Sequence, residues 1–219
     1  MSQTVNSKII AVRPSDVALK TTDFVEKIIS SILEAGEADI VGIGEGIFLA
    51  CSAANMATEI AKVYLNDLCV GPVQTHGQQV TPAISIHLGQ KQMGEYSKLA
   101  EIEEKAMKDL DEQTISVSRA STMDRLITVS LLKLARFEEV RIVAAGGSIT
   151  DAVALAFRLG NGQISKDDVG TKLVNLYSIK MRNDPTKSIA AMSIYMQKGL
   201  SQIYSKRQSE LFNRVEAGI

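Results

Sequence analysis

The stretch Asp39-Ile40-Val41-Gly42-Ile43-Gly44-Glu45-Gly46-Ile47 decides the fold of this chain. Its β-branched residues, followed by closely spaced glycines, predict a buried strand that ends in a tight turn. Residues 47–65 are rich in alanine, which favours a helix with side chains small enough for close packing against a neighbour. The stretch therefore predicts a strand, a turn and a closely packed helix.

Elements on both sides of this stretch complete a domain. Runs of β-branched residues predict strands, and apolar residues at helical spacing predict a further helix, in which Asp23 and Glu26 form a capping box. The predicted elements are a strand at 8–13, a helix at 23–36, a strand at 39–44, a helix at 47–65 and two strands at 68–75 and 80–88. Their order is β-α-β-α-β-β.

The same order of elements returns in the second half of the chain. The repeat has a strand at 114–118, a helix at 122–136, a strand at 140–145, a helix at 149–159 and two strands at 173–182 and 189–196. Asp23 matches Asp124, and Ala83-Ile84-Ser85-Ile86-His87 matches Ala191-Met192-Ser193-Ile194-Tyr195. Ordered matches indicate a tandem duplication, and chance similarity between two α/β segments is the alternative.

The predicted fold class is α/β (α+β), with two tandem β-α-β-α-β-β domains packed as an intramolecular pseudo-dimer. Each domain would otherwise expose the alanine-rich face of its second helix. Apolar periodicity between and after the repeats adds a helical linker and a C-terminal helix. The predicted boundaries are 1–90 for the first domain, 91–111 for the linker, 112–198 for the second domain and 199–219 for the C-terminal helix.

Composition excludes several classes of protein. The chain has 219 residues, 45% of them hydrophobic and 22% charged, as in ordinary globular proteins. Its apolar runs are much shorter than the roughly 18 residues of a membrane span, and its polar start lacks a signal-peptide pattern. We therefore expect a cytoplasmic protein without a membrane partner. Cys51 and Cys69 form no metal-binding pattern, so we expect no metal and no cofactor, and both thiols as apolar fillers of the core.

Charge is distributed unevenly between the two halves. The net charge of the chain is −1, but residues 1–110 carry 9 Lys/Arg and 14 Asp/Glu, a net charge of −5. Residues 111–219 carry 15 and 11, a net charge of +4. A polyanion should therefore be attracted mainly to the second half.

The glycine turns are candidates for phosphate binding, because each lies between a strand and a helix. The first turn lacks the third glycine of a dinucleotide fingerprint, since Ile47 stands there, and Glu45 repels phosphate. In the second turn, Ser148 and Asp151 form a capping pair. We therefore expect structural turns. A nucleotide-binding enzyme is an alternative that requires a closed polar pocket at the turns. His76 and His87 carry no catalytic spacing, so no catalytic residue and no enzyme activity are predicted.

Basic residues gather at two places in the second half. Lys180, Arg182 and Lys187 surround the turn of the last hairpin, and Arg119 and Arg125 surround the start of the first helix of the repeat. Positive charge on a protruding hairpin suits contact with a nucleic-acid backbone. A solvated turn is the alternative.

The order of elements, the polar loop before the first helix, the glycine turn before the second helix and the closing hairpin together resemble the Alba family of archaeal-type nucleic-acid-binding proteins. The resemblance covers most of both halves and is strongest at residues 24–60. It implies a dimer-like pairing and contacts to nucleic acid through the loop and the hairpin. The carried-over positions are Lys20 and Arg119 in the loops and Lys180, Arg182 and Lys187 in the second hairpin.

The chain departs from the family where basic residues are expected. Its loops hold single cations, and the usual arginines before the second helix are missing from both copies. We therefore expect non-catalytic binding of DNA or RNA, of low affinity, through the second domain, with a chromatin or nucleoid role if DNA is the ligand. The alternative is an assembly subunit that binds proteins, either as a homo-oligomer or with an Alba-like partner. Contiguity of Arg119, Lys180, Arg182 and Lys187 distinguishes the two.

Overall fold

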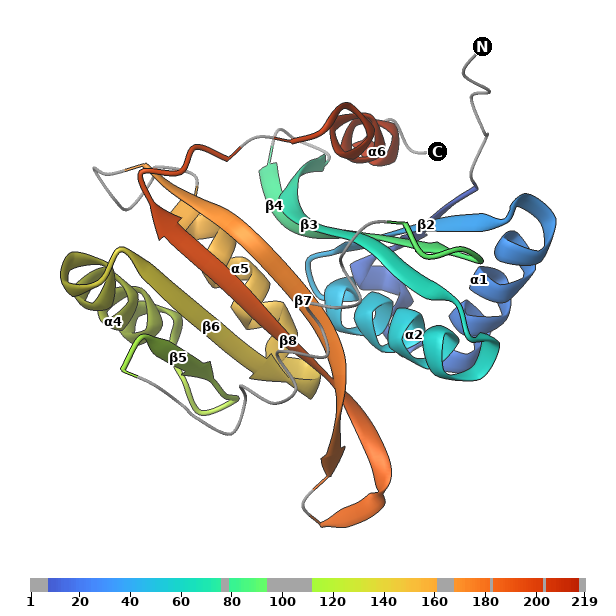
Figure 1. Ribbon diagram of the computed structural model, residues 1–219, viewed down its shortest axis with the longest axis horizontal. Helices are drawn as coiled ribbons and strands as arrows, with labels where there is room; N and C mark the ends of the chain where they lie inside the picture. Colours follow the sequence, from blue (N-terminus) through green and yellow to red (C-terminus); the bar gives the residue numbers. More distant parts are fainter. Residues whose placement is uncertain are drawn as a thin grey trace.

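The computed structural model describes residues 8–75, 79–93, 112–160, 168–181, 183–202 and 204–216. These residues form two four-stranded sheets, with strand orders β1-β2-β4-β3 and β5-β6-β8-β7 (Figure 1). The identical orders confirm the predicted mixed fold of two β-α-β-α-β-β domains. The predicted linker helix falls mostly on residues 94–111, which lie outside the described residues.

The first domain follows the predicted order of elements. It comprises β1 (Ile9–Val12), the short 3-10 helix η1 (Pro14–Ala18), α1 (Thr21–Ala35), β2 (Glu37–Ile43), α2 (Gly46–Ala61), β3 (Tyr64–Thr75) and β4 (Gln79–Gly89). Strand β1 is parallel to β2, and β4 is antiparallel to β2 and to β3. The predicted capping box is wrong, because α1 begins at Thr21 after an extended Lys20 and Asp23 lies inside the first turn.

The second domain repeats this order. It comprises β5 (Thr114–Val117), α4 (Met123–Arg136), β6 (Glu139–Ala145), the short 3-10 helix η2 (Gly146–Ser148), α5 (Ile149–Gly160), β7 (Val169–Met181) and β8 (Asp184–Lys198). Ser148 lies within η2 and does not cap α5, so the predicted pair with Asp151 is wrong. The C-terminal helix α6 (Lys206–Glu216) begins several residues later than its apolar pattern predicts.

Strand register confirms one predicted match between the copies and corrects another. Ser85 pairs with Val41 in the first sheet, and Ser193 pairs with Val143 in the second, so the matched pentapeptides occupy equivalent positions. The buried faces of the first helices correspond as Phe24, Ile28 and Ile32 in α1 with Leu126, Ser130 and Leu134 in α4. By this correspondence, Asp23 of the first domain is equivalent to Arg125 of the second domain, and not to Asp124.

The two domains share one hydrophobic core. Helices α2 and α5 contact each other, and each also contacts strands of the opposite domain. Ala152 and Leu155 of α5 are fully buried there. So are four alanines of α2, namely Ala50, Ala53, Ala54 and Ala57. A Cβ at Gly42 would lie only 2.7 Å from the Cβ of Ala50, so the glycine lets α2 pack directly on β2. This packing confirms the intramolecular pseudo-dimer.

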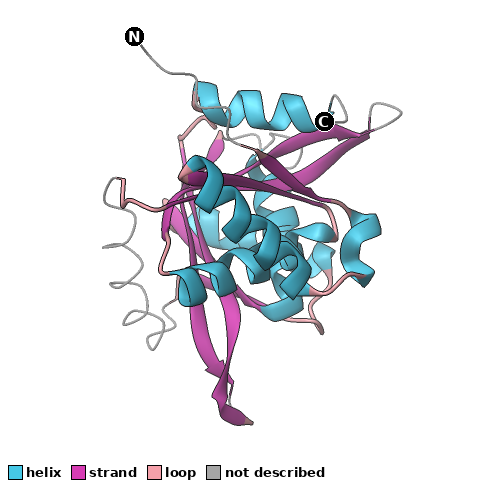
Figure 2. Cartoon of the chain, turned by 90° about the vertical axis from the view of Figure 1, so that its right-hand side faces the viewer, coloured by secondary structure: helices cyan, strands magenta, loops and turns pink. Residues whose placement is uncertain are grey.

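Strands β7 and β8 extend beyond the second sheet as a two-stranded projection (Figures 1 and 2). Strand β8 pairs with β6 from Ala191 onward, whereas Asp184 and residues 188–190 pair with β7 alone. We call residues 178–190 the hairpin arm. At its base, Asn55 of α2 donates a hydrogen bond of 2.6 Å to Ser178 Oγ, which in turn donates to Glu59. The first domain therefore holds the base of the arm.

Helix α6 follows the second domain but packs on the first (Figure 1). Its apolar residues Leu211, Phe212 and Val215 cover the face of the first sheet that points away from α1 and α2. Cys69 lies beneath this helix and Cys51 lies in the shared core, and both are buried free thiols, as predicted. Among the described residues, no helix combines the length and hydropathy that a membrane crossing needs.

Candidate nucleic-acid interface

A groove of about 340 Å³ opens between β5 and α4 of the second domain. Hydroxyl groups dominate its polar lining, and Arg125 is the only charged residue among the described residues that line it. The lining residues are Thr114, Ile115, Ser116, Ser118, Ala120, Ser121, Arg125, Leu126 and Val129. We call this site the β5–α4 groove. Its hydroxyl groups and guanidinium are suited to an oxyanion.

The loop at the mouth of this groove is ordered by hydrogen bonds between two serines. The Ser118 and Ser121 hydroxyl groups lie 3.1 Å apart, and the Ser121 amide donates to the Ser118 carbonyl at 2.9 Å. Thr122 at the N-cap of α4 makes no side-chain capping bond. Amide groups in the first turn of a helix lack intrahelical acceptors, and the helix dipole favours an anion there. The amides at the start of α4 therefore favour an anion, and Asp124 in the same turn offsets part of this attraction.

Arg119 lies against the glycine turn that begins α5. A Cβ at Gly147 would lie 3.2 Å from Arg119 Nη2, so the absent side chain makes room for the guanidinium. The neighbouring Gly146 has a φ of +59°, and a Cβ there would lie 2.6 Å from the Cδ1 atom of Ile189. Ile189 pairs with Ile179 at the base of the hairpin arm. The glycine turn thus connects Arg119 to the arm.

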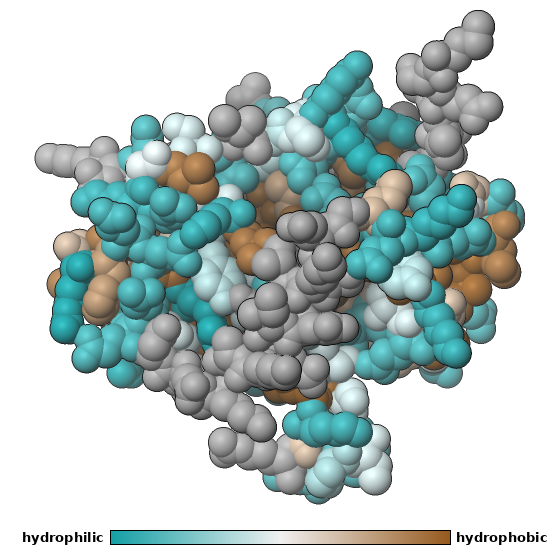
Figure 3. Space-filling view, viewed as in Figure 1, coloured by the Kyte–Doolittle hydropathy of each residue, from teal (hydrophilic) through white to brown (hydrophobic). Residues whose placement is uncertain are grey.

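The cations of the arm differ in their surroundings. Lys180 is exposed and pairs in register with Ser188, next to Ile189. Lys187 Nζ lies 2.9 Å from Asp184 Oδ2, so its charge is partly offset. Hydrogen bonds from the Thr186 hydroxyl and from Lys187 hold the pKa of Asp184 below its usual value. Arg182 lies outside the described residues. Figure 3 shows mostly hydrophilic residues at the end of the arm.

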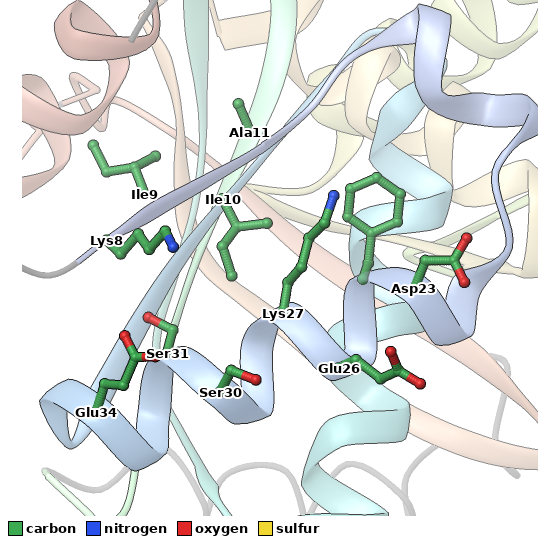
Figure 4. A pocket seen from close by; sticks show the side chains of 11 residues that line it. Lys8, Ile9, Ile10, Ala11, Asp23, Glu26, Lys27, Ser30, Ser31 and Glu34 are labelled. Atoms are coloured by element: carbon green, nitrogen blue, oxygen red, sulfur yellow. The ribbon is translucent and has the colours of Figure 1, made fainter.

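The equivalent groove of the first domain has a different charge. This β1–α1 groove, of about 660 Å³, is lined by carboxylates as well as amines, and Figure 4 shows them along α1 and β1. Its charged lining residues are Lys8, Asp23, Glu26, Lys27 and Glu34. Asp23 stands where the second domain has Arg125. The predicted Lys20 is exposed at the start of α1 and lines neither groove.

A buried charged cluster that the sequence did not predict lies between the first sheet and α6. His87 and Asp39 are 4% and 1% exposed, and Arg207 of α6 contacts both. The sequence signals were polar residues in otherwise apolar strands, Glu37 and Asp39 in β2 and His87 in β4. His76 lies outside the described residues, and within the described ranges no group of three or more His, Cys, Asp and Glu is placed to hold a metal ion.

Comparisons with known proteins add little to this geometry. No family model matches the chain, and no curated protein matches it. Among solved structures, the chain is similar to ALBA1 from Trypanosoma brucei, with 16% identity, a TM-score of 0.35, and coverage of 50% of this chain and 84% of that one. Neither the identity nor the TM-score is high enough to transfer a ligand or a partner.

Proposed function

We propose that this protein binds DNA or RNA, without catalysis, through a basic surface of its second domain. The observation that carries the proposal is the position of Arg119 against Gly147. This contact links the β5–α4 groove, which Arg125 lines, to the base of the hairpin arm. Arg119 and Arg125 form the centre of the proposed surface, and the arm residues Lys180, Arg182 and Lys187 extend it.

The chemistry of the centre matches a phosphate group. Arginine presents donors in a planar fork that fits phosphate oxygens, and serine hydroxyl groups donate to the same oxygens. Ser118 and Ser121 stand beside the uncapped first turn of α4, whose dipole adds a partial positive charge. Contacts of this kind fix a protein on the backbone without selecting bases, so we expect little sequence preference.

The first domain supports the second in this proposal. Its groove carries Asp23 in place of Arg125, which disfavours a polyanion, and Glu45 stands at the N-cap of α2. Its helix α2 instead bonds the base of the arm through Asn55 and Glu59. A duplicated chain can in this way keep one binding surface and use the other copy as a scaffold. Lys20 is the one contact that we propose from the first domain.

The test is a salt series of binding by fluorescence anisotropy, with labelled duplex DNA, duplex RNA and single strands. The variant Arg119→Ala/Arg125→Ala should lower the slope of log K against log salt by about 0.9 for each phosphate of duplex DNA that it no longer neutralises. The control, Arg136→Ala/Lys172→Ala, removes the same charge from the same domain, but from residues that already pair with Glu112 and Glu139. Its slope should stay near that of the wild type.

Equal reductions in slope in the two double variants would mean that net charge, and not the proposed surface, governs binding. A second candidate function is supported by the mixed charges that line the β1–α1 groove, three carboxylates and two amines, and by the net charge of −1. In that case the chain is an assembly subunit that binds proteins. Wild-type protein that binds none of the probes at low salt would favour this second candidate.

A further inference from the structure

The second sheet has a face that points away from α4 and α5, and we call it the outer face of this sheet. Arg141 of β6, Asn175 of β7 and Ser193 of β8 belong to it, because each stands between two residues of the shared core on its own strand. Arg141 is 7% exposed, and Asn175 and Ser193 are 0% exposed. Polar groups are therefore buried on a face that points away from the core.

Two of these buried side chains lack partners. Neither Nε nor Nη2 of Arg141, and neither polar atom of the Asn175 carboxamide, has a hydrogen-bond partner among the described residues. The Arg141 guanidinium instead lies 6.0 Å from the ring centre of Tyr195, its register partner on β8. Buried polar groups are usually hydrogen bonded, and a buried charge without a partner is more costly still. Arg141 therefore calls for a group that accepts hydrogen bonds.

The first sheet shows what the equivalent position can hold. By strand register, Asp39 of β2 is equivalent to Arg141 of β6, because each stands two residues before the valine that pairs with the matched serine. Arg207 contacts the Asp39 carboxylate at 2.9 Å, from the helix α6 that lies on the outer face of the first sheet (Figure 1). The sign of the buried charge is reversed in the second sheet. The equivalent partner of Arg141 is therefore a carboxylate carried by a helix.

The order of the chain points to one source of this helix. Helix α6 follows the second domain and packs on the first. In a pseudo-dimer, the counterpart of α6 is the segment that follows the first domain, residues 94–111, and its place is on the second domain. The segment ends next to Arg141, because the Arg141 amide donates a hydrogen bond of 3.2 Å to the Gln113 carbonyl. Its six carboxylates and three lysines give it the complementary charge.

One carboxylate of this segment falls within an apolar stripe. Leu99, Ala106 and Leu110 recur at helical spacing. Glu103 stands four residues after the first of them and three before the second, so it shares their face of the predicted linker helix. Glu101 falls on the opposite face. A carboxylate that is buried together with apolar neighbours requires a charged partner.

We propose that residues 94–111 dock on the outer face of the second sheet, with the Glu103 carboxylate bound by Arg141. The planar guanidinium fits both oxygens of a carboxylate. Each domain then carries, on its outer face, the helix that follows the other domain. This exchange ties the two domains together outside the shared core.

Hydrogen exchange of the full chain, followed by mass spectrometry, tests the docking, with a synthetic peptide of residues 94–111 as the undocked reference. Amides of residues 99–110 should exchange roughly a hundred-fold more slowly in the protein than in the peptide. Glu103→Gln and Arg141→Met should each lower this protection roughly ten-fold or more, because each leaves one charge of the pair buried alone. Helices α2 and α5 should keep their protection. Glu103→Gln tests the pair without a change to the sheet.

Two further variants complete the test. Glu101→Gln is the matched control, because it makes the same chemical change on the opposite face, and its protection should equal that of the wild type. Arg141→Met/Glu103→Met removes both charges and should regain most of the protection, since an apolar pair is buried without a counter-ion.

Four results would overturn the docking. They are wild-type exchange as fast as that of the peptide, an unchanged protection in Glu103→Gln, an equal loss in Glu101→Gln and Glu103→Gln, and no recovery in the double variant. Protection that rises with protein concentration would also overturn it, because a second copy of the chain would then supply the helix.

Discussion

Substitution of Arg207 by Met should undock α6 and leave the two-domain body folded. Methionine keeps an apolar stem but removes the guanidinium that contacts both oxygens of Asp39. Asp39 is 1% exposed, so the variant leaves a buried carboxylate that has lost the positive charge paired with it. The body does not depend on this contact, because its core joins α2, α5 and the inner faces of the two sheets.

The expected cost follows from the geometry of the pair. Removing one partner of a buried ion pair costs about 3–5 kcal/mol. We expect the lower end here, since the Arg207 side chain is 38% exposed and already partly hydrated. When α6 is released, Asp39 becomes hydrated and no longer carries the cost of burial. The cost of the Arg207→Met substitution therefore cannot exceed the free energy with which α6 docks. A cost of about 3 kcal/mol corresponds to a change of roughly a hundred-fold in the docking equilibrium.

Hydrogen exchange followed by mass spectrometry measures this change. Amide protection within residues 208–216 should fall by roughly a hundred-fold, and protection of α2 and α5 should stay at its wild-type level. Lys206→Met is the matched control, because Lys206 is adjacent, 92% exposed, and pairs only loosely with Glu210 at 3.8 Å. It removes the same charge and should change protection little.

Equal protection of α6 in Arg207→Met and Lys206→Met would refute the anchoring role of Arg207. A joint decrease of protection in α2, α5 and α6 would refute it as well, because the helix would then be part of the global folding unit. The double variant Arg207→Met/Asp39→Asn removes both charges of the pair. It should regain part of the protection of α6, since a neutral amide is less costly to bury than a carboxylate.

Two further predictions concern the arm and the first glycine turn. Lys180→Ala should lower the salt slope of DNA binding by about 0.9, whereas Lys187→Ala should lower it less, because Asp184 already offsets that charge; equal slopes in the anisotropy assay would contradict the difference. Gly46→Ala should destabilise the protein by about 1–3 kcal/mol in urea unfolding, since its Cβ would overlap the carbonyl oxygen of Val12. An unchanged urea midpoint would show that this close approach relaxes without cost.

Local patterns were sufficient to predict the elements and the duplication. Strand and helix periodicity depends on neighbouring residues, so the order of elements and the burial of the α2 alanines were predicted correctly. Helix ends were predicted less well, because the backbone before α1 turns at Lys20 and leaves Asp23 inside the helix. The match of Asp23 to Asp124 failed for a related reason. The match was suggested by the identity of a single residue type. The buried faces of α1 and α4 show that Arg125 is the residue equivalent to Asp23.

The sequence by itself determined the two β-α-β-α-β-β units, the closely packed second helices and the charge difference between the halves, because each is written in local spacing and composition. Only the tertiary structure decided which distant side chains meet. Arg207 reaches Asp39 across 168 positions, and Arg119 meets the turn at Gly147, which opens a different helix. Such contacts depend on where whole elements pack. The shared core sets that placement for Arg119, and the apolar cluster beneath α6 sets it for Arg207. Neither can be derived from the local sequence around these two arginines.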